Sequence, residues 1–476
     1  MKRLLSLLLT CAFLLGALTA CGGGKTEPQT TSSSEPTSAS TAAASAEPAS
    51  AAAEPTEVEL EPFTASEDFP YPYSEELERD ETTGQYLLTL EQALYDYDTM
   101  WMLIRDNFAD LDAACEAYGL DWQRLWQDGR DGLERASVDG KVTAGQFVSV
   151  INSGVEKFRH AGHLFVMSSS FRESIAEMQD MDNYRGNLGA LAANETSERF
   201  YRQEGLDSWL MQSQNSSGLS YEEPDGPDEV VQTVNPGVTL GYADGVPYVG
   251  MTSFGGWTDN TRNAVRAFLT RQTDMNDLIL DIRGNGGGSD REWTQMVQYL
   301  TAEPLEWHRL FAMKTGALNL AVNSGYEPLE ERYICYTDDS WRERYPDVPA
   351  DTFDGMDLVL EGVQQLAPSD HTIGYTGRVW LLVDGSVFSA AESFAYFCKS
   401  SGFAALVGTQ TKGDGVGGGN PYVMALPYSG LLLYYAPYYG VNLDGTCNGI
   451  YGTMPDYETS AATALTDCLA LIRQGG

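Results

Sequence analysis

The amino-acid sequence predicts an α/β fold for the C-terminal half of the chain and a mainly helical region ahead of it. The short apolar runs at 278–282 and 379–383 have the length and continuity of strands buried on both faces of a parallel sheet. Segments with helical spacing of apolar residues follow these runs, at 290–300 and 391–400. Because strands that alternate with helices are typical of βαβ units, we expect a layered α/β core.

The first 21 residues have the pattern of a secretion signal rather than of a folded domain. Lys2 and Arg3 precede an apolar stretch at 4–17, which is too short for a membrane-spanning helix. The sequence LTAC at 18–21, followed by glycines, resembles a bacterial lipoprotein signal. The resemblance implies that Cys21 is lipidated and that the mature protein is anchored to the extracytoplasmic face of the cell membrane. An ordinary secretion signal that happens to contain Cys21 is the alternative.

The rest of the chain divides into four regions by composition. Residues 22–61 consist mostly of Ser, Thr, Ala, Pro and Glu without any aromatic, which predicts a disordered linker because such a composition cannot bury a core. We expect an N-terminal helical subdomain at 62–165, a variable inserted region at 166–236 and the α/β core at 237–476.

Charge and cysteine usage exclude several classes of function. A net charge of −39 argues against nucleic acid and anionic lipid as partners, because both require a basic face. The cysteines outside the signal are scattered without a CxxC pair, which argues against a zinc site. We therefore expect no metal and no organic cofactor, and contact with the membrane through the lipid anchor only.

Residues 384–394, DGSVFSAAESF, place a serine at the start of a predicted helix. One interpretation is structural: Ser389 caps the helix and Glu392 completes a capping box. The other is catalytic: Ser389 is a nucleophile whose oxygen lies where backbone N–H groups would stabilise an oxyanion.

Three further stretches contain residue types suited to catalysis. The run LILDIRGNGGG at 278–288 exposes backbone N–H groups after a strand, and it matches neither a P-loop nor a dinucleotide-binding loop. Two of the four histidines, His160 and His163, lie together in RHAGHLFV, where either could serve as a base near neutral pH. The glycine-rich loop VGTQTKGDGVGGG carries Lys412 and Asp414.

In their order along the chain, DIRGNGGG, SAAE, VGTQTKGDG, LPYSG and GTMPD resemble the C-terminal processing (tail-specific) serine proteases and the related tricorn-type core. The resemblance covers about 237–457. It implies a ClpP/crotonase-like protease core, a nucleophile at Ser389, and an oxyanion hole formed by the N–H groups of Gly287 and Ala390. No convincing PDZ pattern is found at 164–235.

The sequence departs from the processing-protease pattern at the general base. The lysine of that branch aligns with Asp414, and Lys412 lies two residues earlier. The tricorn-like branch instead uses a histidine after Gly or Ser, which His163 matches because it follows Gly162. That branch places its acid where this chain has 448–449, so Asp414 or Asp444 is expected to substitute.

These observations predict a membrane-anchored, extracytoplasmic serine peptidase that acts on peptides or proteins. Ser389 would form the acyl-enzyme, His163 would act as general base, and Asp414 would orient the imidazole. One alternative is a Ser389/Lys412 dyad. Another is a non-catalytic surface lipoprotein that binds peptides in a degenerate protease cleft.

Overall fold

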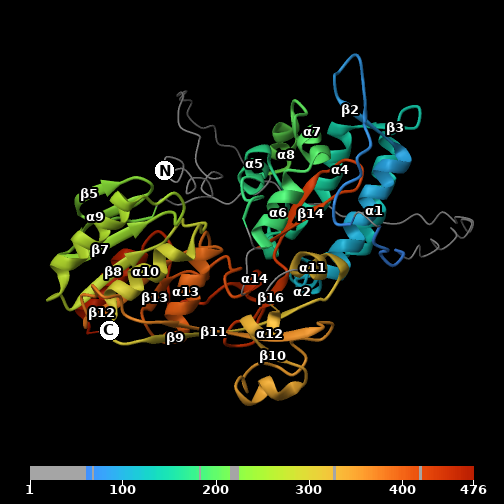
Figure 1. Cartoon of the computed structure of the whole chain (residues 1–476). Helices are drawn as coiled ribbons and strands as arrows, with labels where there is room; N and C mark the ends of the chain where they lie inside the picture. Colours follow the sequence, from blue (N-terminus) through green and yellow to red (C-terminus); the bar gives the residue numbers. More distant parts are fainter. Residues whose placement is uncertain are drawn as a thin grey trace, which may run out of the picture. The chain divides into compact units, whose positions relative to one another are not determined.

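A seven-stranded sheet is the centre of the α/β core in the computed structural model of this chain (Figure 1). The structure describes residues 60–66, 69–181, 184–214, 224–324, 328–417 and 421–475. Neighbouring strands are parallel from β17 to β7, and β6 and β5 extend the sheet as antiparallel strands. The strand order is β17 (Tyr457–Glu458), β13 (Ala405–Gly408), β12 (Arg378–Val383), β8 (Asp277–Asp281), β7 (Val246–Met251), β6 (Val238–Ala243) and β5 (Glu229–Val234).

The two apolar runs predicted as buried strands are β8 and β12, which lie side by side and parallel. Helices α9 (Asp259–Leu269), α10 (Asp290–Leu300) and α13 (Ala390–Ser401) pack their apolar faces on one side of the sheet, where Trp293 stacks on Phe394. Helix α15 (Ala464–Arg473) packs on the other side through Leu465. The α/β prediction is therefore confirmed, and the carboxyl ends of β8 and β12 bring the glycine motif and Ser389 to the same sheet edge.

The predicted start of the α/β core at residue 237 needs a correction. Strand β5 pairs with β6 along the edge of the core sheet, although its residues fall in the region expected to be an insertion. The sequence of β5, EVVQTV, interrupts its valines with polar residues, and its side chains are mostly exposed. The strand therefore lacks the continuous apolar run that marks β8 and β12.

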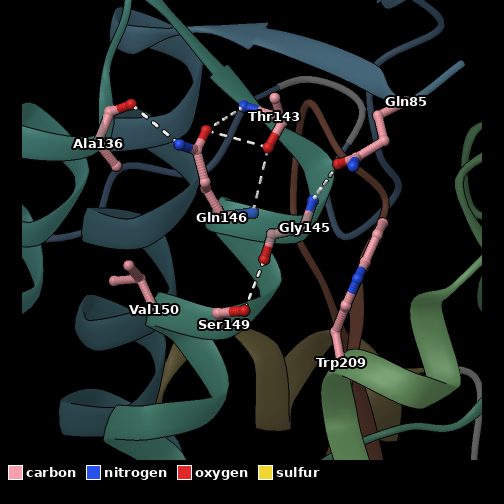
Figure 2. A pocket seen from close by; sticks show the side chains of 8 residues that line it. All are labelled: Gln85, Ala136, Thr143, Gly145, Gln146, Ser149, Val150 and Trp209. Atoms are coloured by element: carbon pink, nitrogen blue, oxygen red, sulfur yellow. Dashed lines mark hydrogen bonds between the residues drawn. The ribbon is translucent and has the colours of Figure 1, made fainter. Parts of the chain in front are cut away.

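The region before residue 165 is mainly helical, as expected. It contains α1 (Leu90–Asn107), α2 (Leu111–Tyr118), α3 (Trp122–Ala136) and α4 (Ala144–Val155) beside a small sheet of β1 (Glu78–Arg79), β2 (Tyr86–Thr89) and β3 (Lys141–Thr143). Thr89 and Thr143 begin α1 and α4 with capping boxes. Figure 2 shows the start of α4, where Gln146 and Thr143 exchange hydrogen bonds beside a pocket that also contains Trp209.

Residues from 166 onward form four short helices: α5 (Ser169–Ala176), α6 (Tyr184–Ala192), α7 (Glu195–Tyr201) and α8 (Leu206–Gln214). Helices α7 and α8 are separate because the chain turns through Gly205 at positive φ. The hairpin of β14 (Tyr422–Ala425) and β15 (Leu432–Tyr435) pairs with β4 (Phe165–Val166). A segment from the C-terminal half therefore completes a sheet with the N-terminal region.

A separate four-stranded sheet contains β10 (Ile334–Tyr336), β11 (Leu358–Leu366), β9 (Leu305–Met313) and β16 (Tyr438–Gly440) in that order. Short helices α11 (Ala317–Asn323), α12 (Leu329–Arg332) and α14 (Asn448–Tyr451) lie in the connections. In the part of the chain that the structure describes, no helix has the length and apolar character needed to cross a bilayer. The predicted signal peptide with Cys21, and the linker up to residue 59, lie outside the described residues.

Candidate active site

Ser389 lies in the sharp turn between β12 and α13. Its backbone has φ 56° and ψ −124°, a conformation that costs energy for any residue with a Cβ. The side chain makes no capping hydrogen bond to the helix, so the capping interpretation is wrong. Glu392, the expected partner in a capping box, is instead fully buried and accepts hydrogen bonds from Asn448 and Thr453.

The Oγ of Ser389 is hydrogen-bonded to Nε2 of His163 at 3.0 Å. The other ring nitrogen, Nδ1, is hydrogen-bonded to Oδ2 of Asp414. His163 ends a short 3₁₀ turn, Ala161–His163, directly before β4, and its side chain is 12% exposed. The structure thus brings the three predicted residues into one hydrogen-bonded relay, which has the nucleophile–base–acid order of a serine hydrolase triad.

Asp414 lies in the glycine-rich loop after β13, and its side chain is 6% exposed. Its N–H donates to the backbone oxygen of Asn448, while Oδ1 of Asn448 accepts from the N–H of Gly415. Asn448, which occupies the position expected for the acid, therefore holds the loop that carries the acid. Asp444 accepts hydrogen bonds from Thr446 in an exposed turn and is not part of the relay.

Two more buried acids lie near this relay. Burial raises the pKa of Glu392 to about 7. Burial, together with the charge of Asp414, raises the pKa of Asp110 well above its ordinary value. Burial also lowers the pKa of His160 to about 4, so this second histidine is neutral at pH 7.

The glycine motif lies against the nucleophile. Gly287 has φ 106°, and a Cβ built on it would come within 2.8 Å of both the Phe388 oxygen and the Ser389 Cβ. The N–H of Gly287, which is predicted to be an oxyanion donor, donates to Oδ1 of Asn285 at 2.9 Å. The N–H of Ala390, at the first turn of α13, has no hydrogen-bond partner among the described residues.

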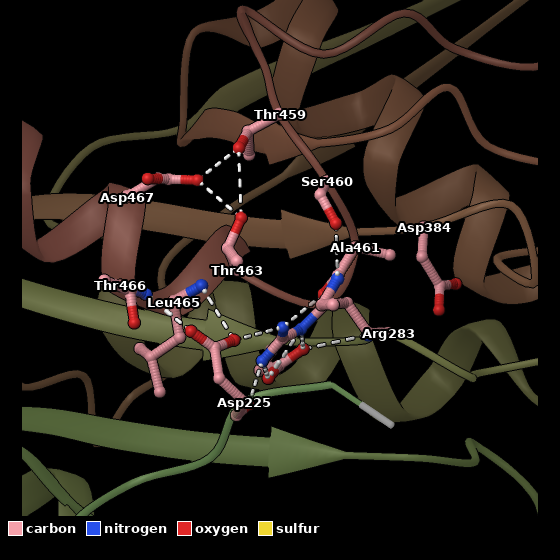
Figure 3. Close-up of polar contacts among 12 residues, drawn as sticks. Asp225, Arg283, Asp384, Thr459, Ser460, Ala461, Thr463, Leu465, Thr466 and Asp467 are labelled. Atoms are coloured by element: carbon pink, nitrogen blue, oxygen red, sulfur yellow. Dashed lines mark hydrogen bonds and ion pairs between the residues drawn. The ribbon is translucent and has the colours of Figure 1, made fainter. Parts of the chain in front are cut away.

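Two residues that the sequence analysis did not single out hold this motif in place (Figure 3). The Arg283 guanidinium is buried and donates to Asp281, to Asp225 and to the backbone oxygen of Ala461 (Figure 3). Asp384 accepts from the N–H of Gly284 and so ties the glycine motif to the turn that carries Ser389. Because the Arg283 guanidinium is buried and bonded to these groups, its function is structural. In the sequence, its place inside the glycine motif was the one signal that pointed to it.

Lys412 lies beside the relay but is not bonded to Ser389. Its Nζ lies 4.9 Å from the centre of the Phe388 ring, and that ring packs on the imidazole of His163 with 4.6 Å between centroids. Desolvation lowers the pKa of Lys412, and the charge of Asp414 acts in the opposite direction. The half-buried ring of Tyr434 contacts His163 from another direction. The imidazole is therefore flanked by two aromatic rings.

Within the described residues, no group of three or more His, Cys, Asp or Glu side chains is arranged to hold a metal ion. What the site can do chemically follows from the relay itself: an alcohol, a base and a buried acid in hydrogen-bond contact.

Comparisons with solved structures find proteins that are similar to this chain. Mature CPAF is similar to this chain at 13% identity, over 81% of this chain and 97% of CPAF, with a TM-score of 0.50. A candidate peptidase from Parabacteroides merdae is similar at 15% identity, over 81% of this chain and 96% of that protein, with a TM-score of 0.47. The photosystem II D1 C-terminal processing protease is similar at 15% identity, over 80% of this chain and 96% of that protein, with a TM-score of 0.38. A comparison of the sequence with curated proteins gives no match.

The sequence itself matches a protein family over the α/β core. Residues 245–459, which include Ser389 and Asp414 and exclude His163, match peptidase family S41. The matched range begins at β7 and ends at β17, so it spans the parallel part of the core sheet. The α/β core of the chain is therefore similar to peptidase family S41, and this match supports a peptidase.

Proposed function

We propose that this peptidase hydrolyses peptide bonds through an acyl-enzyme on Ser389, with His163 as general base and Asp414 as the acid that orients it. The observation that carries the proposal is the relay of hydrogen bonds from Ser389 Oγ through both ring nitrogens of His163 to Asp414. Such a relay activates a hydroxyl that is a weak nucleophile by itself.

In the proposed mechanism, Ser389 Oγ attacks the peptide carbonyl while His163 Nε2 takes the hydroxyl proton. The carboxylate of Asp414 fixes the tautomer with its proton on Nδ1 and stabilises the imidazolium that forms. His163 then gives the proton to the leaving amine, which departs as the acyl-enzyme forms. Water attacks the ester with the same base, so that the carboxylic acid product leaves and Ser389 regains its proton.

The negative charge on the carbonyl oxygen needs donors during both steps. The free N–H of Ala390 supplies one donor at the positive end of α13. Gly287 supplies a second donor only if its N–H leaves Oδ1 of Asn285. Substrate binding would therefore exchange one hydrogen bond of the glycine motif for a bond to the oxyanion.

The geometry favours this mechanism over the Ser389/Lys412 dyad. A lysine base must reach the hydroxyl whose proton it removes, at about 2.6–3.2 Å. Lys412 Nζ contacts the face of Phe388, whereas Ser389 Oγ is already bonded to His163. The intact relay likewise argues against a degenerate cleft that only binds peptides.

We also propose that the enzyme works outside the cytoplasmic membrane, where it is held by lipid on Cys21. The support comes from the LTAC sequence after an apolar signal and from the aromatic-free composition of the following residues. Cys21→Ser should abolish incorporation of labelled palmitate and release the protein from the membrane fraction. Unchanged fractionation would contradict the anchor.

Labelling with a fluorophosphonate probe tests the catalytic proposal on a soluble chain of residues 62–476. Ser389→Ala and His163→Asn should lose labelling. His160→Asn is the matched control, since both histidines have positive φ, which asparagine tolerates. Loss of labelling in His163→Asn with retention in His160→Asn supports the base. Equal labelling of His163→Asn and the unchanged chain would exclude it.

A further inference from the structure

Lys412 differs from most lysines in the described part of the chain because it forms no ion pair with a carboxylate there. Among the described lysines, Lys141, Lys314 and Lys399 each form an ion pair with an acidic side chain. Lys412 and Lys157 are exposed and form none among the described residues. With 68 acidic and 29 basic residues in the sequence, an unpaired lysine beside the active site is a notable arrangement.

The backbone fixes Lys412 beside the nucleophile. Its N–H donates to the oxygen of Val387 at 2.8 Å, and the next residue, Gly413, accepts from the N–H of Ser389 at 3.1 Å. Two strand-like backbone bonds therefore tie Lys412 to the turn that carries Ser389. The backbone from which the Lys412 side chain extends is therefore held against this turn.

The ammonium group lies on the face of Phe388, one ring away from the imidazole of His163. A cation on an aromatic face is attracted by the ring, which holds Nζ near the relay while its other donors stay available. The neighbouring carboxylate of Asp414 is bonded to His163 Nδ1 and forms no ion pair with Lys412 among the described residues. The positive charge is thus placed next to the reacting groups with free hydrogen-bonding capacity.

We propose that the ammonium of Lys412 binds a carboxylate of the substrate, so that the enzyme prefers peptides with an acidic group close to the scissile bond. The proposal rests on the proposed function of Ser389 and adds the substrate class. A peptide carries its carboxylates on Asp and Glu side chains and at its C-terminus, and a lysine point charge recognises both. The overall charge of −39 repels acidic peptides, so a local cation would be needed to admit them.

Matched fluorogenic peptides test the proposal on residues 62–476. One arm compares Glu with Gln at each position flanking the scissile bond, and the other compares a free C-terminal carboxylate with its amide. The unchanged chain should cleave an acidic peptide of at least one arm with a higher kcat/KM. Lys412→Met should lower the ratio of kcat/KM for the acidic peptide to that for its neutral partner about 10-fold, mainly through KM of the acidic peptide. The arm that responds identifies the source of the carboxylate.

Lys157→Met is the control, since Lys157 is also exposed and forms no ion pair among the described residues, and it should keep the preference. Lys412→Glu should reverse the preference toward peptides that carry Lys in the same position. An equal effect of Lys412→Met on acidic and neutral peptides would overturn the proposal, as would the absence of any preference in the unchanged chain.

A binding measurement separates this proposal from the proposed function. Fluorescence anisotropy on Ser389→Ala, with and without Lys412→Met, reports peptide affinity without any cleavage. Tighter binding of acidic peptides that disappears with Lys412→Met supports the carboxylate site even if the chain cleaves and labels nothing. Equal binding of acidic and neutral peptides, with cleavage intact, leaves the catalytic proposal standing and rejects this one.

Discussion

The backbone at Ser389 shows how the chain presents the proposed nucleophile. A residue at φ 56° and ψ −124° turns its side chain away from the helix it begins, toward the base. The bond from Ser389 Oγ to His163 replaces the capping bond that a serine normally makes in this position. Part of the folding free energy is therefore spent on keeping a reactive oxygen accessible.

The close approach of Gly287 to this turn gives a residue-scale prediction. Gly287→Ala should slow fluorophosphonate labelling on the order of 10²–10³-fold, because its Cβ would collide with Ser389 and displace the oxyanion donors. Gly286→Ala is the control, since a Cβ there meets nothing within 4 Å and its φ is not positive. Labelling rates and melting temperatures should be measured together. A wild-type labelling rate in Gly287→Ala would show that the close approach is unimportant.

At the scale of elements, Arg283 connects strand β8 to the segment that begins α15. It is 1% exposed and binds Asp281, Asp225 and the oxygen of Ala461. The two acids are ordered by one guanidinium, and Asp225 in turn accepts from the N–H groups of Leu465 and Thr466. The glycine motif and the C-terminal helix are thus stabilised as a unit.

Arg283→Met should lower the free energy of unfolding by about 3–5 kcal/mol, because it leaves buried carboxylates without their partner. Arg283→Lys should retain only part of the lost free energy of unfolding, since an ammonium cannot reproduce the planar set of donors of a guanidinium. Urea denaturation of residues 62–476 measures both. Arg291→Met, at an exposed arginine of α10, is the control and should stay within about 0.5 kcal/mol of the unchanged chain. A similarly small effect at Arg283 would contradict the anchoring function.

At the scale of the whole molecule, sequence patterns predicted individual strands and helices, because these depend on residues close together in the chain. Continuous apolar runs located β8 and β12, and helical spacing located α10 with its observed bounds. Pairing between distant segments left no local signal, so the sequence did not show that β14 and β15 complete a sheet with β4.

The candidate site shows the same division between local and distant signals. Ser389 and His163 stood out by residue type and by resemblance, whereas the acid was narrowed only to Asp414 or Asp444 until the fold placed one of them beside His163. Arg283 and the bond between Gly287 and Asn285 depend on atomic positions that no periodicity encodes.

The buried Glu392 predicts how the stability of the whole fold depends on pH. Its folded pKa of about 7 exceeds its ordinary value of 4.5, so the native state binds this proton more tightly than the unfolded chain does. The resulting stabilisation is complete below about pH 4.5 and is lost as the pH rises through about 7. Glu392→Gln has no charge to bury and keeps an acceptor for Asn448 and Thr453.

Relative to the unchanged chain, Glu392→Gln should gain on the order of 2–3 kcal/mol of unfolding free energy between pH 4.5 and pH 7.5. Urea denaturation at several pH values measures this difference, and the comparison cancels the titration of all other groups. A difference that stays constant with pH would mean that Glu392 is charged throughout this range.

His163 and Ser389 lie 226 residues apart in the chain, and Asp414 follows both. During synthesis the proposed base, His163, is made first, the proposed nucleophile, Ser389, follows, and the acid Asp414 is made last. A growing chain therefore lacks the complete relay until residue 414 has been made. Because the relay joins residues from distant parts of the chain, it can form only once these parts have folded together.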